Sequence, residues 1–227
     1  MSLTVEQARR LGGVVGILFV VIAVVAVFLP GSPPKADEVA KIGSYLTDKR
    51  GSILAGSYLT CLAFVFFLLF MGALRSQFSA FDRTGIHPGS AALAGGVAGA
   101  SMVFAGTAVL NGAVFQVAAA GDANLNHALY DVANDLFFAS GFGFAAFFAG
   151  AAVAVRITGA LPSALAPAGL LVALINLVGG VGLFAKTGFF AIGGAFGFIV
   201  PLASLLWILA ASIAMLRPAS AAPSAAG

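Results

Sequence analysis

The sequence predicts an all-α membrane protein, a bundle of six transmembrane helices. Of its 227 residues, 61% are hydrophobic and only 8% are charged, whereas a typical soluble domain carries about 25% charged residues. Six stretches are apolar for long enough to cross a hydrocarbon core, which takes about 20 helical residues. Residues 14–28, for example, show none of the alternating polarity of a transmembrane β-strand. Helices are favoured because they satisfy every backbone hydrogen bond within the lipid.

The predicted spans form one polytopic domain over residues 1–217. They comprise residues 11–30, 52–74, 91–118, 132–155, 165–185 and 192–216. The third span is longer than a perpendicular crossing needs, so we expect it to tilt or protrude. Residues 218–227 are rich in Ala, Pro and Ser and are predicted to be a disordered tail.

The first span follows Arg9 and Arg10 and therefore has two interpretations. It resembles a secretory signal in its charge pattern, but its apolar stretch exceeds the usual 7–15 residues or so. No small-residue cleavage site precedes Pro30. We therefore interpret it as a permanent span anchored at the inner face of the membrane.

The positive charges predict the orientation of the bundle. An even number of spans places both termini on one side, and we expect that side to be the cytoplasm. The cytoplasmic side then carries Arg9, Arg10, Arg75, Arg83, Arg156 and Arg217, and the outer side carries Lys35, Lys41, Lys49, Arg50 and Lys186. The cytoplasmic set lies tightly at the span ends, where positive charge has most influence on orientation.

An outer amphipathic segment is predicted after the first helix. A cluster of Pro and Gly at residues 30–34 breaks the chain. Residues 36–50 then have the apolar spacing of a helix that lies on the outer surface or caps the bundle. Its apolar side comprises Val39, Ile42, Tyr45 and Leu46.

The richest polar constellation lies at the outer end of the fourth span. His127, Asp131 and Asp135 are spaced by four residues, and Tyr130 and Asn134 stand beside them. This spacing predicts one polar face of a helix. A carboxylate inside a membrane costs roughly 2.5–3.5 kcal/mol on insertion scales and usually faces the bundle interior. Asp135 is therefore the leading candidate for a functional residue.

Other polar side chains are expected to meet this face. They are Asn111, Gln116, Asn176, Lys186 and Thr187, with Tyr58 and Thr60 in the second span. Two interpretations stay open: a structural polar network between helices, or an outward-facing pocket with Lys186 as counter-charge. A metal site is disfavoured, because three ligands on one face of one helix with no second His are a weak signal.

Several functional classes lack their signatures. A haem held between helices needs two axial ligands at one depth, but His87 and His127 are predicted on opposite sides of the membrane. Cys61 is the only cysteine, so neither a disulfide nor a thiolate cluster is expected. The net charge of +3 is spread thinly, which excludes a nucleic-acid partner. We expect no cofactor, and an enzyme is disfavoured.

The lipid bilayer is the expected partner. Gly12 and Gly16, Gly95 and Gly99, and Gly193 and Gly197 are spaced by four. Such pairs let helix backbones approach closely, either within the chain or between chains. A homo-oligomer or a partner in a membrane complex is therefore a further hypothesis.

The layout of the chain carries a resemblance. Its features are the amphipathic stretch that ends in residues 47–50 (TDKR), the span that closes on Leu74-Arg75, the polar stretch 128–131 (ALYD), Arg156, and Leu161-Pro162. It resembles a family of uncharacterised six-span integral membrane proteins of high-GC, actinobacterial-type bacteria. The resemblance implies a multi-pass protein of the bacterial plasma membrane and transfers no catalytic residues.

Three functions follow as expectations. The first is a structural or accessory membrane protein with a polar network in the outer half of the bundle. The second is a small-solute or ion transporter or channel that uses a pocket around Asp135. A membrane enzyme is the third and least favoured.

Overall fold

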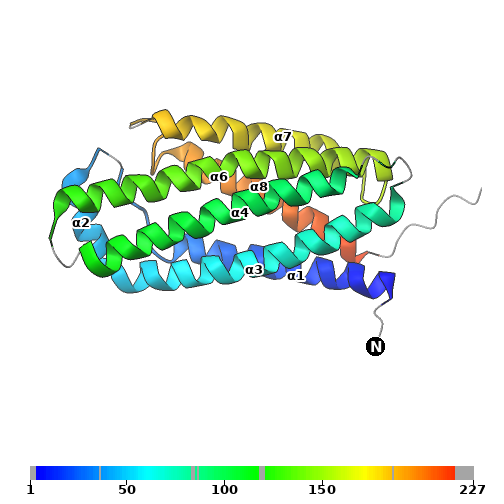
Figure 1. Ribbon diagram of the computed structural model, residues 1–227, viewed down its shortest axis with the longest axis horizontal. Coiled ribbons are helices and arrows are strands. Elements are labelled where there is room, and N and C mark those ends of the chain that lie inside the picture. The colour runs from blue at the N-terminus through cyan, green and yellow to red at the C-terminus, as the bar shows by residue number, and fades with distance from the viewer. Residues whose placement is uncertain are drawn as a thin grey trace, which may run out of the picture.

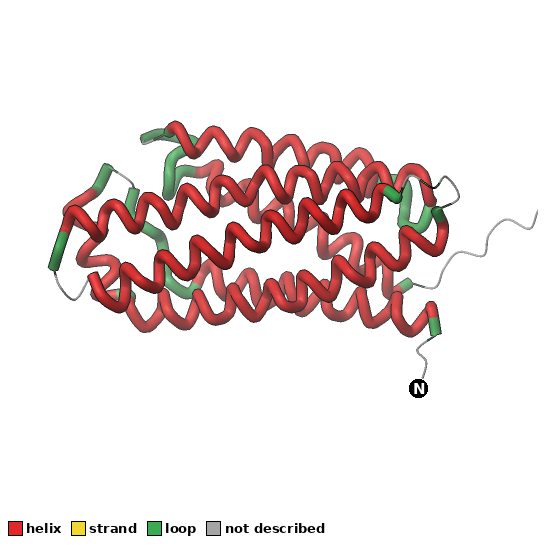
Figure 2. The backbone as a smooth tube through the Cα atoms, in the orientation of Figure 1, coloured by secondary structure: helices red, strands yellow, loops and turns green. Residues whose placement is uncertain are grey.

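The computed structural model describes residues 4–35, 37–82, 85, 87–117, 121–185 and 187–217. Within these residues all regular structure is helical and no strand occurs (Figures 1 and 2). The long helices are α1 (Val5–Phe28), α3 (Arg50–Phe81), α4 (Pro88–Gly112), α6 (Ala123–Thr158), α7 (Leu165–Gly179) and α8 (Ala195–Leu216). The short ones are α2 (Val39–Asp48), the π-helical η1 (Ala113–Val117) and the 3-10 helix η2 (Gly180–Phe184).

Six described helices, some with their short extensions, are long and apolar enough to cross a membrane. This confirms the predicted number of spans and gives the class of the protein, a multi-pass membrane protein. Each long helix packs against the next in the chain, and α8 returns to α1. The six helices therefore surround a common interior.

The two ends of the bundle differ. The Arg9 guanidinium of α1 donates to the Ala214 carbonyl of α8 at 3.5 Å, so both outer helices meet at one end (Figure 1). We call this the terminal end. The opposite end, the α2 end, holds α2 and the first turns of α3 and α6.

Local signals set the helix limits. The Thr4 hydroxyl accepts from the Gln7 amide and the Gln7 side chain accepts from the Thr4 amide, which is a capping box at the start of α1. The Asp122 carboxylate accepts from the Leu125 amide at 3.0 Å and starts α6. Gly159 ends α6 with φ +63°, a backbone conformation that glycine adopts without strain.

Two helices are longer than a membrane requires. At a rise of about 1.5 Å per residue, the 36 residues of α6 extend about 54 Å and the 32 residues of α3 about 48 Å. A crossing of about 20 residues that ends beside Arg156 begins near Leu136. With this placement the first turns of α6 extend beyond the hydrocarbon, and the predicted spans cover only part of each of the two helices.

The helix α2 is shorter than the predicted segment 36–50. Ile42 and Leu46 are fully buried against the α2 end of the bundle, whereas Lys41 and Ser44 are exposed. The Lys41 ammonium donates to the Glu38 carboxylate at 2.6 Å, and this hydrogen bond lowers the pKa of Glu38. Which side of the membrane α2 occupies stays a prediction.

Glycines bring the helices close together in the half of the bundle nearer the terminal end, which we call the terminal half. A Cβ at Gly95 would lie 2.6 Å from the Phe147 amide nitrogen of α6, and one at Gly13 would lie 2.7 Å from the Ser212 carbonyl of α8. The predicted pair at residues 95 and 99 therefore packs within the chain, as does the pair at residues 12 and 16. Gly193 precedes α8 with φ +72°, so the third pair is not one helical face. None of the three pairs supports a homo-oligomer.

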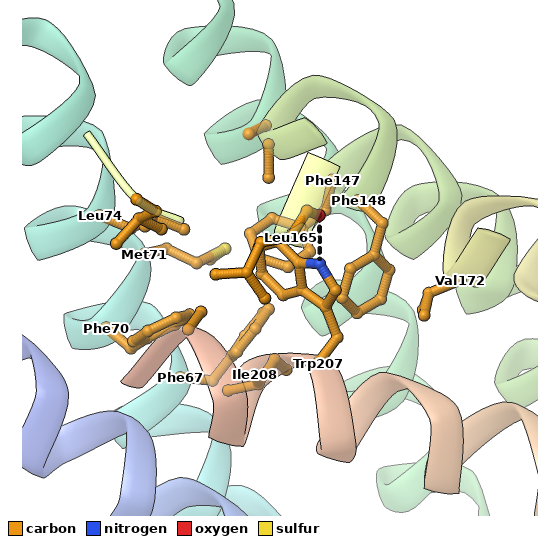
Figure 3. Close-up of a cluster of buried hydrophobic side chains, with 14 of the residues drawn as sticks. Phe67, Phe70, Met71, Leu74, Phe147, Phe148, Leu165, Val172, Trp207 and Ile208 are labelled. Atoms are coloured by element: carbon orange, nitrogen blue, oxygen red, sulfur yellow. Dashed lines mark hydrogen bonds between the residues drawn. The ribbon is translucent and has the colours of Figure 1, made fainter. Parts of the chain in front are cut away.

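An aromatic core fills the interior of the terminal half. The rings of Phe67, Phe147 and Phe148 are fully buried, and the Trp207 ring stands edge-on to Phe148 at 5.3 Å (Figure 3). The indole N–H of Trp207 donates to the Leu165 carbonyl at 2.9 Å (Figure 3). The interior therefore closes at this level.

Candidate functional site

A cavity of about 680 Å³ occupies the interior between this aromatic core and the α2 end. All six long helices contribute to its walls. Its floor consists of Phe19, Phe67, Phe148 and Ile208, each no more than 5% exposed. If the hydrocarbon part of α6 covers residues 136–155, Phe148 lies near the middle of the bilayer.

The roof of the cavity consists of Tyr45 from α2 and of two loops, 30–33 and 190–194. The Tyr130 hydroxyl of α6 donates to the Pro34 carbonyl at 2.8 Å, and both residues are buried. This hydrogen bond attaches the first loop to the wall. Burial raises the pKa of Tyr45 above its ordinary value of 10.0, so its phenol is neutral at physiological pH.

Two amides in the wall are held by the protein itself. The Asn134 amide donates to the Tyr130 carbonyl at 2.7 Å, within α6. The Asn176 amide of α7 donates to the Val172 carbonyl at 2.9 Å and to the Ser204 hydroxyl of α8 at 3.0 Å. Asn176 thus connects two helices, as the interpretation of a structural polar network expects.

Three hydroxyl groups in the wall are not used in this way. Ser57, Thr60 and Thr107 line the cavity, and their hydroxyls make no hydrogen bond within the described part of the chain. Other hydroxyls in these two helices donate to the carbonyl four residues earlier, as Ser76 of α3 and Ser101 of α4 do. The three cavity hydroxyls are therefore available to a ligand or to water.

The cavity holds no charge: among the described residues that line it there is no Asp, Glu, Lys or Arg. Phenylalanine and small aliphatic residues form most of the surface. Apolar walls with a few hydrogen-bonding groups are typical of pockets for small, mostly apolar ligands.

The structure divides the predicted polar face of α6 into two. Successive residues of a helix are turned by about 100°. Tyr130 and Asn134 face the cavity, whereas Asp135 is exposed and does not line it. Val132 and Phe142, on the same outer side, are also exposed. Asp135 is therefore not part of this cavity, and the predicted pocket around it stays a prediction.

His127 and Asp131 pair with each other outside the cavity. The His127 Nε2 and Asp131 Oδ2 atoms are 3.3 Å apart, on side chains about one-third exposed. If the crossing of α6 begins near Leu136, the polar side chains of its first turns lie at the level of headgroups and water. The other carboxylate oxygen of Asp131, Oδ1, is buried and accepts no hydrogen bond from a described residue.

The remaining predicted residues also separate. Asn111 is half-buried and does not line the cavity, and its Oδ1 accepts no hydrogen bond from a described residue. Tyr58 is 70% exposed on the outside of α3. Lys186 lies outside the described residues, as does the tail 218–227, so the proposed counter-charge has no described position. Nothing is described of the Gln116 side chain.

Sequence reasoning missed Ser57 and Thr107 as cavity residues. Ser57 and Thr60 are three residues apart, which places both on one face of α3. That signal is weak, since helical hydroxyls commonly bond to their own backbone. In the described part of the chain, no group of three or more His, Cys, Asp or Glu residues is placed to hold a metal ion.

Comparison with protein-family models, with curated proteins and with solved structures finds no match to this chain. The functional assignment therefore depends on the geometry of the cavity.

Proposed function

We propose that this multi-pass membrane protein binds a neutral and largely apolar molecule in its central cavity. The observation that supports this proposal is the uncharged, mostly apolar cavity of about 680 Å³. Its volume falls within the range of about 300–1,000 Å³ that is common for small-molecule sites. A charged ligand would lose its hydration there without gaining an opposite charge.

The cavity favours ligand binding over a purely structural role. Protein interiors are packed about as densely as organic crystals. Left unfilled, a cavity of this size forfeits dispersion contacts along its lining, so a bundle that served only for assembly would gain stability by closing it. An ion or polar-solute transporter is less well supported, because the carboxylate expected to serve it faces outward.

We also propose the plasma membrane of a bacterium as the location, with both termini in the cytoplasm and α2 outside. The support is the set of arginines at the terminal end and the resemblance of the layout to bacterial six-span proteins. A partner in a membrane complex stays a hypothesis.

Trp207 offers a direct test of the cavity, because it is the only tryptophan in the chain and lies beside the floor residue Phe148. Bromine atoms quench indole fluorescence at short range. We expect a brominated alkane, titrated into the protein in lipid nanodiscs, to quench Trp207 saturably. Thr60→Phe, which fills the cavity, should weaken this quenching about tenfold, equivalent to about 1.4 kcal/mol.

The matched control is Ala55→Phe, which places the same ring on the exposed side of α3. It should leave the titration unchanged. Quenching that rises linearly with the alkane and is equal in all three proteins would show that the cavity binds nothing, and would overturn the proposal.

A further inference from the structure

We propose that the ligand is a lipid-like amphiphile with an uncharged, hydroxyl-bearing head, and that it enters sideways from the bilayer between α1 and α8. This inference rests on the proposed function and names the class of ligand and its route. It is carried by the position of the opening, the depth of the cavity and the unused hydroxyl groups.

The opening lies on one side of the bundle. The exposed residues among those that line the cavity all belong to the end of α1, the loop after it, and the start of α8 with the loop before it. They are Val27, Phe28, Gly31, Ser32, Gly193, Gly197 and Phe198. The lining residues contributed by α3, α4, α6 and α7 are buried or half-buried. The cavity therefore opens between α1 and α8.

Two contacts frame this opening. At the terminal end α1 lies against α8, where a Cβ at Gly13 would be 2.7 Å from the Ser212 carbonyl. At the α2 end the two loops meet, where a Cβ at Gly193 would be 3.3 Å from the Pro33 carbonyl. Between these contacts α8 runs obliquely away from α1 (Figure 1). The result is a window in the side of the bundle.

The window faces lipid. Val24 and Val25 on α1 and Ile199 and Leu202 on α8 flank it, and all four are exposed. Exposed aliphatic side chains on transmembrane helices lie in the hydrocarbon region. A ligand that passes through the window therefore comes from the membrane interior.

The cavity is about as deep as one leaflet. On α1 its lining runs from Phe19 to Phe28, nine positions or about 13.5 Å along the helix. Half of a hydrocarbon core of about 30 Å is about 15 Å. A lipid of the leaflet at the α2 end would thus enter without changing its depth or its orientation.

Hydrogen-bonding groups gather toward the α2 end of the cavity, where the head of such a lipid would lie. Ser57 is 6% and Thr107 is 3% exposed, yet neither hydroxyl has a partner among the described residues. The Tyr45 phenol joins them from the roof. Each of these three hydroxyls can donate and accept a hydrogen bond, and together they match an uncharged head with hydroxyl groups, such as that of a monoacylglycerol.

The head is tested with three lipids that share one brominated acyl chain: a monoacylglycerol, a lysophosphatidylcholine and a fatty acid above its pKa. We expect the monoacylglycerol to quench Trp207 at the lowest mole fraction, at least fivefold below the two charged lipids. Thr107→Val removes one hydroxyl at nearly constant volume and should weaken quenching by the monoacylglycerol several-fold, but not quenching by the brominated alkane. Ser101→Ala, whose hydroxyl bonds to its own helix, is the control.

Equal quenching by the three lipids, or no effect of Thr107→Val, would overturn the assignment of the head and mean that water satisfies the hydroxyls. The alkane titration would still report whether the cavity binds. Loss of saturable quenching by the alkane would instead overturn the proposed function itself. The two failures are therefore distinguishable.

The route is tested by filling the window. Gly197 borders it and has open space around its α-carbon, so Gly197→Phe should slow the onset of monoacylglycerol quenching at least tenfold after rapid mixing with brominated vesicles. Gly72→Phe places the same ring at an equally open position on the outside of α3 and should not change the rate. An unchanged rate in Gly197→Phe would overturn sideways access.

Discussion

The Tyr130 side chain connects the wall of the cavity, which α6 contributes, to the loop that forms part of its roof. Its hydroxyl donates to the Pro34 carbonyl across 96 positions of sequence, in a buried setting. Proline leaves the roof loop with few backbone donors, so this side chain supplies a connection that the loop itself cannot make. The hydrogen bond is therefore structural and locates one boundary of the cavity.

Tyr130→Phe removes only this hydroxyl. The buried Pro34 carbonyl is then left without its donor, so we expect the free energy of unfolding to fall by about 1–3 kcal/mol. Thermal unfolding of the purified protein in a mild detergent, followed by circular dichroism, measures the change. Tyr58→Phe, at an exposed position on α3, should change stability by less than about 0.5 kcal/mol. Equal melting of the two variants would contradict the structural role of the hydroxyl.

The sequence predicted part of the site at this scale. Tyr130, Asn134 and Asn176 were among the candidates and do line the cavity. The helical period places Tyr130 and Asn134 in one row and Asp131 and Asp135 in the next, but both rows are polar. The helical period does not indicate which of the two rows faces the interior of the bundle. The length of α6, which exceeds a membrane crossing, is needed to explain why Asp135 is exposed.

At the scale of elements, α4 and α6 form the closest helix pair. A Cβ on Gly143 would lie 2.7 Å from the Gly99 α-carbon and 2.9 Å from the Gly95 carbonyl. Backbone faces backbone here, so neither helix has a flexible side chain that can move aside. Small residues in this arrangement allow dispersion contacts along both helices, the main source of helix association in lipid.

Gly143→Ala should therefore force the two helices apart. We expect a loss of about 1–3 kcal/mol or more, typical of overpacking, measured as a lower detergent or thermal midpoint of unfolding. Gly72→Ala is the matched control, because nothing lies within 4 Å of the added methyl group. If both alanines were tolerated equally, the close approach of α4 and α6 would be contradicted.

Helix number was predictable, but helix ends were not. Hydropathy identifies the apolar stretch that lies in lipid and stops at the first polar residues. In α3 and α6 the helix continues through these polar residues, because the backbone hydrogen bonds of the helix continue where the apolar stretch ends. The π-helical turn η1 after α4 and the 3-10 helix η2 after α7 likewise leave no hydropathy signal.

At the scale of the whole molecule, the ring of six helices determines which helix ends lie at the same end of the bundle. The terminal end carries the start of α1 and the end of α8, and the α2 end lies one membrane thickness or more away. Hydropathy predicted six crossings, yet the order of neighbours and the divergence of α8 from α1 are tertiary features that no residue count reveals. The window was therefore not predictable from the sequence.

The orientation in the membrane is tested by cysteine labelling in a Cys61→Ser background. Ser44→Cys in α2 and Ser163→Cys between α6 and α7 are both exposed and lie at opposite ends. With cytoplasmic termini, a membrane-impermeant maleimide should label Ser44→Cys in intact cells and Ser163→Cys only after permeabilisation. The reverse pattern would place the termini outside.

The side window determines the units in which affinity must be expressed. A molecule that reaches its site through lipid is diluted by lipid, so its effective concentration is a mole fraction in the leaflet. Doubling the volume of buffer would then leave the bound fraction unchanged, whereas doubling the carrier lipid at a fixed amount of ligand would lower it. For this fold, the bilayer itself is the solvent from which the ligand partitions.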